Sequence, residues 1–251
     1  MDDDLRSILI SAYEADLLAL EACEVDDPVE IRQRAVAALK HNPLSVNAWC
    51  LIASQAPAGS EQQLDLFHRA MTIAMSLAGM GPNGEGPSPD DPAARPLAKA
   101  LAGLASAQRA SGNLDHAIDT YFEVLRFDPT DGFRIRYDLA HCLLTTRRVR
   151  RLSKLLRRFE ADRSAIWCWT RALIEFRMES DDANDWLDNA VDSNPYIGPY
   201  LLNRLNWDGE APVHCQPAEE TEAAWYSSRF AQHWNDGPDA KSWLAHRTGL
   251  N

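Results

Sequence analysis

The densest run of charged side chains in the chain is basic and lies within residues 147–158. It comprises Arg147, Arg148, Arg150, Arg151, Lys154, Arg157 and Arg158. Guanidinium and ammonium groups bind carboxylates and phosphates. If the run is one helix, four of these residues share a face opposite the apolar one, namely Arg147, Arg151, Lys154 and Arg158. The run therefore predicts a docking helix for an acidic peptide, an anionic headgroup or a nucleic-acid backbone, or else a solvated face paired with neighbouring acids.

A second set of polar side chains recurs at helical spacing upstream and downstream of this run. These candidate residues of a partner-binding groove are Lys99, Ser106, Arg109, Tyr137, His141 and Glu175. Two smaller side chains, Cys168 and Ala172, are expected on the floor of the same groove. A groove of this width suits an extended or helical peptide.

Residue patterns of catalysis and metal binding are missing from the sequence. It has no His-Glu-x-x-His, no Gly-x-Ser-x-Gly, no phosphate loop and no dinucleotide fingerprint. His141 stands next to Cys142 and His214 next to Cys215, but no Cys-x-x-Cys pair offers zinc its usual chelation. We therefore expect no catalytic residues, no cofactor and no metal, and a protein that is not an enzyme.

The composition is that of a soluble globular chain that is strongly acidic outside one segment. The 251 residues carry a net charge of −12 and are 45% hydrophobic. Segment 132–158 has nine basic side chains against one acid, so the rest of the chain holds 16 of the 25 basic and 36 of the 37 acidic residues. This balance disfavours a nucleic-acid partner. Five scattered cysteines, an acidic N-terminus and the lack of a long apolar run predict a cytoplasmic protein without a membrane span.

Helical periodicity dominates the elements that must position these side chains. Near the N-terminus an apolar stripe at i, i+3/i+4 spacing comprises Leu5, Ile8, Leu9, Ala12, Leu17, Leu20 and Cys23. Three residue pairs, at 42–43, 128–129 and 194–195, place a proline after Asn or Asp at the end of an amphipathic run. Proline cannot continue a helix, so each pair predicts a helix end.

The spacing of these three prolines indicates a repeat. Pro129 and Pro195 are 66 residues apart, and Pro43 and Pro129 are 86 apart. Between the latter lies the 18-residue stretch 79–96, which has four glycines and five prolines; without it the interval is 68. Both intervals are close to twice the period of about 34 residues of the tetratricopeptide repeat, a helix–turn–helix unit.

These observations predict an all-α fold, a tetratricopeptide-like solenoid of about four helix pairs with a C-terminal helical cap. Small residues such as Ala117 and Ala190 stand where paired helices approach closely. We expect N-terminal helices and first repeats over 1–78, an inserted Gly/Pro loop over 79–96, repeats over 97–207, and a polar loop with capping helices over 208–251, in one continuous domain.

An ordered series of short motifs carries a family resemblance. They are HNPLSVNAW at 41–49, LAGLA at 101–105, GNLDHAI at 112–118, FDPTD at 127–131, RYDLAHCLL at 136–144, ALIEFR at 172–177, NP at 194–195, YLL at 200–202 and, after Trp234, DAKSWL at 239–244. In this order the chain resembles the suppressor-of-tumorigenicity-seven family and its bacterial tetratricopeptide-like relatives, from about Val29 to Leu244. Asp239 stands where the family tends to have glycine, and the membrane segments of its animal members are absent. The resemblance implies a helical-repeat fold and an interaction role, with no catalytic motif.

The leading hypothesis is a non-catalytic adaptor that binds one or more proteins or peptides through the groove of its repeats. One alternative is an acidic inhibitor or immunity-type protein that masks a basic partner through acids such as Glu219, Glu220 and Glu222. The other is a regulator that docks an anionic partner on the basic helix. The sequence leaves the oligomeric state open.

Overall fold

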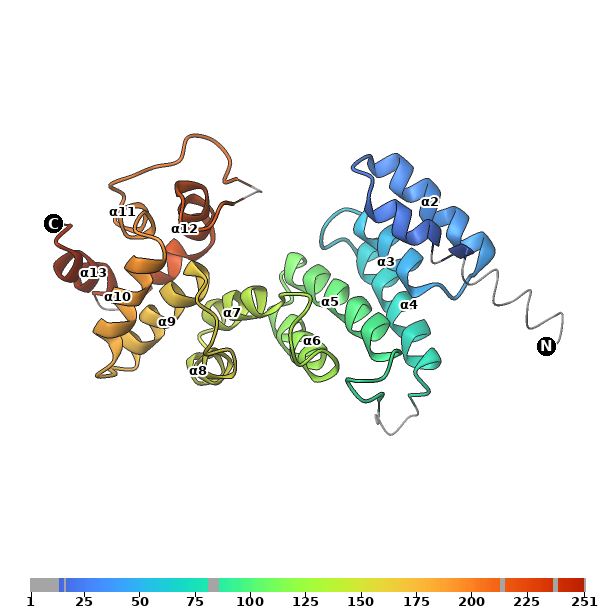
Figure 1. Ribbon diagram of the computed structural model, residues 1–251, viewed down its shortest axis with the longest axis horizontal. Helices are drawn as coiled ribbons and strands as arrows, with labels where there is room; N and C mark the ends of the chain where they lie inside the picture. Colours follow the sequence, from blue (N-terminus) through green and yellow to red (C-terminus); the bar gives the residue numbers. More distant parts are fainter. Residues whose placement is uncertain (1–13, 16, 81–85, 213–214, 237–238, 251) are drawn as a thin grey trace. The chain divides into compact units, whose positions relative to one another are not determined.

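The computed structural model describes residues 14–15, 17–80, 86–212, 215–236 and 239–250. All regular structure in these residues is helical, and none of it is strand, so the all-α prediction is confirmed. The chain divides into two compact units, Met1–Cys142 and Leu143–Asn251 (Figure 1). None of the helices within the described ranges is long and apolar enough to cross a lipid bilayer.

Unit 1 consists of helices that pack in chain order. They are α2 (Pro28–His41), α3 (Val46–Ser54), α4 (Glu61–Leu77), α5 (Ala94–Ala110) and α6 (Leu114–Phe127), followed by α7 (Arg136–Thr145), which continues into unit 2. Each of α2 to α5 contacts the next helix, and α3 also contacts α5 (Figure 1). Consecutive helices of unit 1 are therefore in contact, and α3 and α5 also contact each other although α4 lies between them in the sequence.

The predicted helix ends at Asn-Pro and Asp-Pro pairs are confirmed. Asn42 caps the C-terminus of α2, Asp128 that of α6, and Asn194 that of α10 (Ala183–Ser193). Their backbones have left the helical region, as the following proline requires. The alanines expected at close helix contacts are also buried, since Ala117 and Ala190 have no exposed surface.

The N-terminal apolar stripe is wrong in the part that the structure describes. Leu17 and Leu20 are 43% and 65% exposed, and Cys23 is exposed too. The buried side of these helical residues consists of Ala15, Ala19 and Ala22. Ala15 packs with Ala38 and Ala48 of α2 and α3, where small side chains allow close approach of the helices. Residues 5, 8, 9 and 12 of the stripe lie outside the described residues.

The Gly/Pro insertion is shorter than predicted at its C-terminal end. Residues 94–96 already form the first turn of α5, because proline is tolerated there: its missing N–H has no partner in a first turn. The described part of the insertion also packs on unit 1. A Cβ added to Gly86 would lie 2.7 Å from the ring of Phe127. Residues 81–85 of the insertion lie outside the described residues.

Unit 2 is built around one central helix. Its elements are α8 (Val149–Arg158), α9 (Ala165–Arg177), α10, α11 (Ile197–Leu201), α12 (Glu220–Asn235) and α13 (Ala240–Thr248). Helix α9 pairs with α10 and contacts α8, α12 and α13 as well. The tail predicted over 208–251 does contain helices, and they cover α9 with aromatic side chains. Trp169 meets Trp234 edge to face at 5.8 Å, and Phe176 stacks on Trp243 at 4.5 Å.

Candidate functional site

A partly exposed polar strip in unit 1 lies on α5 and α7, which we call first helices, as we do α3 and α9, because each precedes a neighbouring helix of a pair. The strip comprises Lys99, Ser106, Arg109, Tyr137 and His141. Lys99 on α5 donates a hydrogen bond from Nζ to Asn47 Oδ1 on α3 at 2.9 Å. Ala102 and Ser106 follow Lys99 on the same side of α5, and both are partly exposed. Their small side chains leave room between the polar groups. Lys99 and Ser106 are therefore partly accessible to solvent, and their place in a groove stays a prediction.

Arg109 ends this strip in a partly buried electrostatic cluster. Its Nε lies 3.7 Å from Asp138 Oδ1 on α7, and both side chains are mostly shielded from solvent. Burial works to lower the pKa of Arg109, but the charges of Asp138 and Tyr121 outweigh it and raise that pKa. Burial also raises the pKa of the Tyr121 hydroxyl. Arg109 is thus a permanent positive charge that links two first helices, α5 and α7.

Tyr137 and His141 lie on α7 and are partly exposed. Tyr137 is held by its neighbours: Arg136 Nη2 donates to the tyrosine hydroxyl at 3.0 Å, and the Arg136 guanidinium lies 4.6 Å from the ring centroid. Arg136 is itself anchored, because its Nη1 donates to the buried carboxylate of Asp131 at 2.8 Å. The ring of Tyr137 is therefore a firmly oriented aromatic surface.

Of the residues predicted for the groove on α9, Cys168 and Ala172 are buried and Glu175 is partly exposed. Cys168 and Ala172 are 2% and 0% exposed, so neither lines a surface. Glu175 accepts a hydrogen bond from Arg171 Nε at 3.4 Å, and the Arg171 guanidinium lies 3.7 Å from the centroid of Trp186 on α10. Cys168 and Ala172 are buried because α9 is covered by α8, α10, α12 and α13, and the polar residues Arg171 and Glu175 pair with each other.

The basic run does not form one continuous helical face. α8 begins at Val149, so Arg147 lies in the preceding turn and Arg148 at the N-cap. Arg151 is only partly exposed. The exposed basic side chains of α8 are Arg150, Lys154, Arg157 and Arg158. Its apolar side is buried through Leu152, Leu155 and Leu156, so the predicted division into two faces is confirmed while the membership of the basic face is corrected.

The inhibitor hypothesis expected Glu222 on the surface, and this is wrong. It is 8% exposed, and its Oε2 accepts hydrogen bonds from Asn194 Nδ2 and from the backbone N–H of Ala218, both at 2.9 Å. The carboxylate therefore joins α12 to the end of α10. Glu219 and Glu220 remain exposed.

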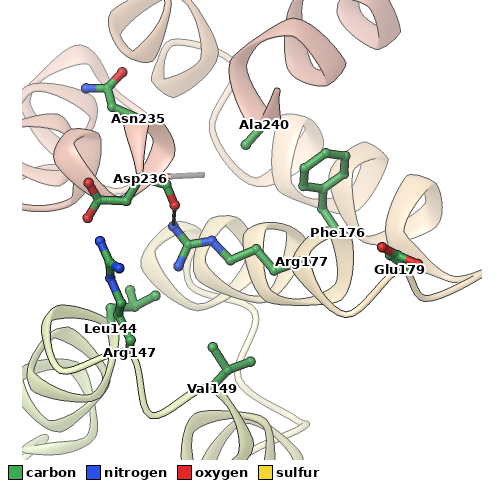
Figure 2. Close-up of a pocket in the computed structure, with 9 residues that line it drawn as sticks. All are labelled: Leu144, Arg147, Val149, Phe176, Arg177, Glu179, Asn235, Asp236 and Ala240. Carbon is green, nitrogen blue, oxygen red and sulfur yellow. Dashed lines mark hydrogen bonds between the residues drawn. The ribbon is translucent and has the colours of Figure 1, made fainter. Parts of the chain in front are cut away.

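A pocket in unit 2 was not foreseen from the sequence pattern. It has a volume of about 650 Å³ and is lined by Leu144, Arg147, Val149, Phe176, Arg177, Glu179, Asn235, Asp236 and Ala240 (Figure 2). Arg177 Nη2 donates to the carbonyl oxygens of His233 and, at 3.0 Å, of Asp236, and so caps the C-terminus of α12. Burial lowers the pKa of Arg177, and the nearby charge of Arg147 lowers it further against the opposing effect of Asp236.

The sequence did contain a signal for this pocket. Gly112 occupies the turn between α5 and α6 with a left-handed φ of 83°. Arg147 and Glu179 occupy the turns after α7 and α9 with φ of 55° and 53°. Two charged residues thus stand in a backbone conformation that favours glycine, and both line the pocket.

No cluster of three or more potential metal ligands occurs in the parts of the chain that the structure describes. In comparisons with known proteins, no family model matches the chain and no curated protein matches it significantly.

Proposed function

We propose that this chain is a non-catalytic interaction protein of tetratricopeptide-like helix pairs, which binds a peptide segment of a partner protein on the polar strip of unit 1. The observation that carries the proposal is the direct contact between α3 and α5, joined by the hydrogen bond from Lys99 to Asn47. In stacked helix pairs the first helices line the concave side, and that side is the recurrent peptide-binding surface.

The chemistry of the strip suits a peptide with polar side chains and an aromatic or apolar anchor. Lys99 offers further N–H donors beyond the one it gives to Asn47. Ser106 adds a hydroxyl, and Ala102 leaves space for a side chain to enter. On α7 the oriented ring of Tyr137 supplies an apolar face with a polar edge. Such a mixture allows main-chain hydrogen bonds and one buried contact in the same segment.

A photoreactive side chain introduced at Ser106 tests this proposal in the protein's native cells. Ser106 is half exposed in the middle of the strip, so a bound partner should be cross-linked from it. The matched control is the same side chain at Asp65, which is exposed on α4. We expect specific adducts from position 106 that are absent from position 65. Identical adducts from both positions, or none from 106, would contradict binding on this strip.

The exposed bases of α8 favour a second candidate function, the docking of an anionic partner. Arg150, Lys154, Arg157 and Arg158 lie on the side of α8 opposite its buried leucines, so replacing them leaves the core side unchanged. The replacement removes the hydrogen bond from Arg157 to Ser153 and the contact of Arg158 with the Phe159 ring. Replacing these four with serine should weaken an anionic partner's binding strongly at low salt and little at high salt, since exposed charges are screened. Full affinity of the quadruple variant at low salt would exclude α8 as the docking surface.

A further inference from the structure

The turns after α7 and α9 keep charged residues in a backbone conformation that favours glycine. In each turn the second residue after the helix has a left-handed φ, and two backbone hydrogen bonds close the motif. For Arg147 these run from its N–H to Leu144 O at 2.9 Å and from the next N–H to Leu143 O at 2.8 Å. The turn at Glu179 has the same pair of bonds, both 3.0 Å long. The turns at Gly79, Gly112 and Asn203 are closed in the same way. The fold thus accepts glycine at this position, and Arg147 and Glu179 are charged residues that stand there instead.

This conformation disfavours a side chain. Left-handed backbone brings Cβ close to the following carbonyl oxygen, and non-glycine residues held there concentrate at functional sites. Arg147 and Glu179 come from different turns, 32 positions apart, yet both line the pocket of unit 2 (Figure 2). Asp131, Arg134, Asn203, Ala218 and Asp239 have the same conformation outside the pocket, so the role of Arg147 and Glu179 is argued from the charge and lining of the pocket.

The two ends of the pocket differ in charge. At one end the Arg147 guanidinium points toward the Asp236 carboxylate, while the Arg177 guanidinium donates to the backbone carbonyl oxygen of Asp236 (Figure 2). Two positive charges therefore lie near one carboxylate at that end. Among the described residues, neither guanidinium has a carboxylate within ion-pair distance. That end therefore carries an excess positive charge in a partly enclosed site, where an anion is attracted more strongly than in bulk water. Glu179 lies at the other end, beyond Phe176.

The walls between the charged residues are apolar. Leu144, Val149 and Ala240 line the pocket together with Phe176, whose ring is held in place by stacking on Trp243 at 4.5 Å. A volume of about 650 Å³ is within the range of small-molecule sites in proteins, which combine apolar walls with a few polar groups. Bare phosphate would leave these walls in contact with water.

We propose that the pocket of unit 2 binds a small organic anion, a single carboxylate on an apolar body. Arg147 and the free N–H groups of Arg177 bind the carboxylate, as guanidinium groups do in two-donor geometry. Phe176 and Val149 contact the apolar body. Glu179 repels a second negative charge at the far end, which restricts the site to monoanions.

Titration of the full chain with a set of simple probes tests the ligand class. The set comprises hexanoate, octanoate and 3-phenylpropanoate, with inorganic phosphate and phenethylamine as controls that lack the apolar body or the carboxylate. We expect calorimetric or NMR-detected binding of at least one carboxylate with Kd below about 1 mM, and at least ten-fold weaker binding of both controls. If the amine or phosphate binds as tightly as the best carboxylate, or if no carboxylate reaches this affinity, the proposal is wrong. A peptide ligand from the cross-linking experiment would leave this result unaffected, because that surface belongs to unit 1.

Replacing Arg147 with glycine separates binding from stability. The Arg147→Gly variant loses an anchoring charge and relieves the left-handed backbone, so we expect at least ten-fold weaker probe binding together with a melting temperature raised by about 2–4 °C. Arg134→Gly is the matched control, since Arg134 is exposed in unit 1 and has the same left-handed φ, 56°. It should stabilise the protein similarly and leave binding intact. Unchanged binding in Arg147→Gly, equal loss in Arg134→Gly, or a lower melting temperature of Arg147→Gly alone would overturn the assignment.

Glu179→Gly tests the restriction to monoanions. Adipate has the length of hexanoate and a second carboxylate, so the native protein should bind adipate at least ten-fold more weakly than hexanoate. In Glu179→Gly this difference should shrink several-fold, because the repelling charge is gone. If the ratio of the adipate Kd to the hexanoate Kd is the same in Glu179→Gly as in the native protein, Glu179 does not contribute to the site.

Discussion

Helices α5 and α9 each pair tightly with the helix that follows, yet α5 keeps a partly exposed polar side while α9 is covered. Both are first helices of a tight pair, α5 with α6 and α9 with α10. α5 keeps a half-exposed polar strip, from Lys99 to Arg109. α9 is covered by α12 and α13, and its residues Trp169, Cys168 and Ala172 are buried. The comparison shows that α5 keeps an accessible polar face where no later segment covers it, whereas α9 does not.

The cover over α9 creates the pocket as well as the core. Packing of α12 and α13 on α9 brings Asp236 and Ala240 next to Phe176 and Arg177. In unit 1 the corresponding side of α5 carries polar bonds to its neighbouring first helices instead. Helix α5 therefore carries an open strip in unit 1, whereas α9 contributes Phe176 and Arg177 to a partly enclosed pocket in unit 2.

The largest expected effect concerns the aromatic cover of unit 2. Trp169→Ala should destabilise this unit by about 3–5 kcal/mol, because a fully buried ring that packs on Trp234 is lost. Trp169→Phe should cost much less, since it keeps most of the ring and removes an indole N–H that is buried without an acceptor. Hydrogen exchange of the α12 amides during denaturant unfolding measures both changes. Unaltered protection of α12 in Trp169→Ala would mean that the cover does not depend on this ring.

Overpacking of the helix pairs should affect both units alike. Ala117→Leu in α6 and Ala190→Leu in α10 should each destabilise by ~1–3 kcal/mol, because each alanine is fully buried against its paired first helix. The control Ala110→Leu changes an exposed residue at the end of α5 and should be nearly neutral. Denaturant midpoints of the three variants provide the measurement. A strong effect of only one buried variant would show that the two pairs are not packed equivalently.

Alkaline pH should destabilise unit 1 through its buried thiols. Burial raises the pKa of Cys50 from 9.0 to about 11, against the lowering effect of Lys99. The unfolded thiol loses its proton first, so stability falls as the pH rises from the unfolded to the folded pKa. By linkage one such thiol costs roughly 1.4 kcal/mol between about pH 8 and pH 10. Cys50→Ala should lose that much less stability over this interval, whereas Cys23→Ala, an exposed position, should follow the parent curve.

The smallest effect compares two arginine–tryptophan stacks. Arg69 lies 4.0 Å from the ring centroid of Trp49 in unit 1, and Arg171 lies 3.7 Å from that of Trp186 in unit 2. Arg69→Ala should cost ~0.5–1 kcal/mol in unfolding free energy, as a partly exposed cation–π contact does. Arg171→Ala should cost more, because Glu175 also loses its partner. Equal costs would indicate that the ion pair of α9 contributes nothing measurable.

Much of the local structure followed from residue type and spacing. Asn42, Asp128 and Asn194 end helices because a proline follows each of them, and this restriction acts over two residues only. Ala117 and Ala190 were expected at close helix contacts, because their size suits no other packing role at those positions. Long stripes were less reliable. Leu17 and Leu20 have the right spacing for a core, but Ala15 and Ala19 on the other side fit closer to the neighbouring helices.

The candidate sites divide in the same way. Lys99, Ser106 and Arg109 are partly exposed on α5, because they lie on one helix whose periodicity fixes their common side, and their role in a groove stays a prediction. Cys168 and Ala172 were expected on the floor of the groove but are buried, since helical spacing does not report which later segment covers a face. Arg147 was predicted to lie on the basic helix, but that helix begins two residues later. A glycine at position 147 would have indicated the helix end in the sequence, whereas the left-handed turn there contains arginine.

By itself, the sequence determined the all-helical class, the helix ends at Asn42, Asp128 and Asn194, and the concentration of positive charge in one segment. These depend on steric and electrostatic preferences of residues close together in the chain. Only the tertiary structure decided that α9 is covered while α5 is open, and that Arg147, Arg177 and Asp236 meet at one pocket. Those outcomes depend on contacts between residues up to 89 positions apart, which no local preference encodes.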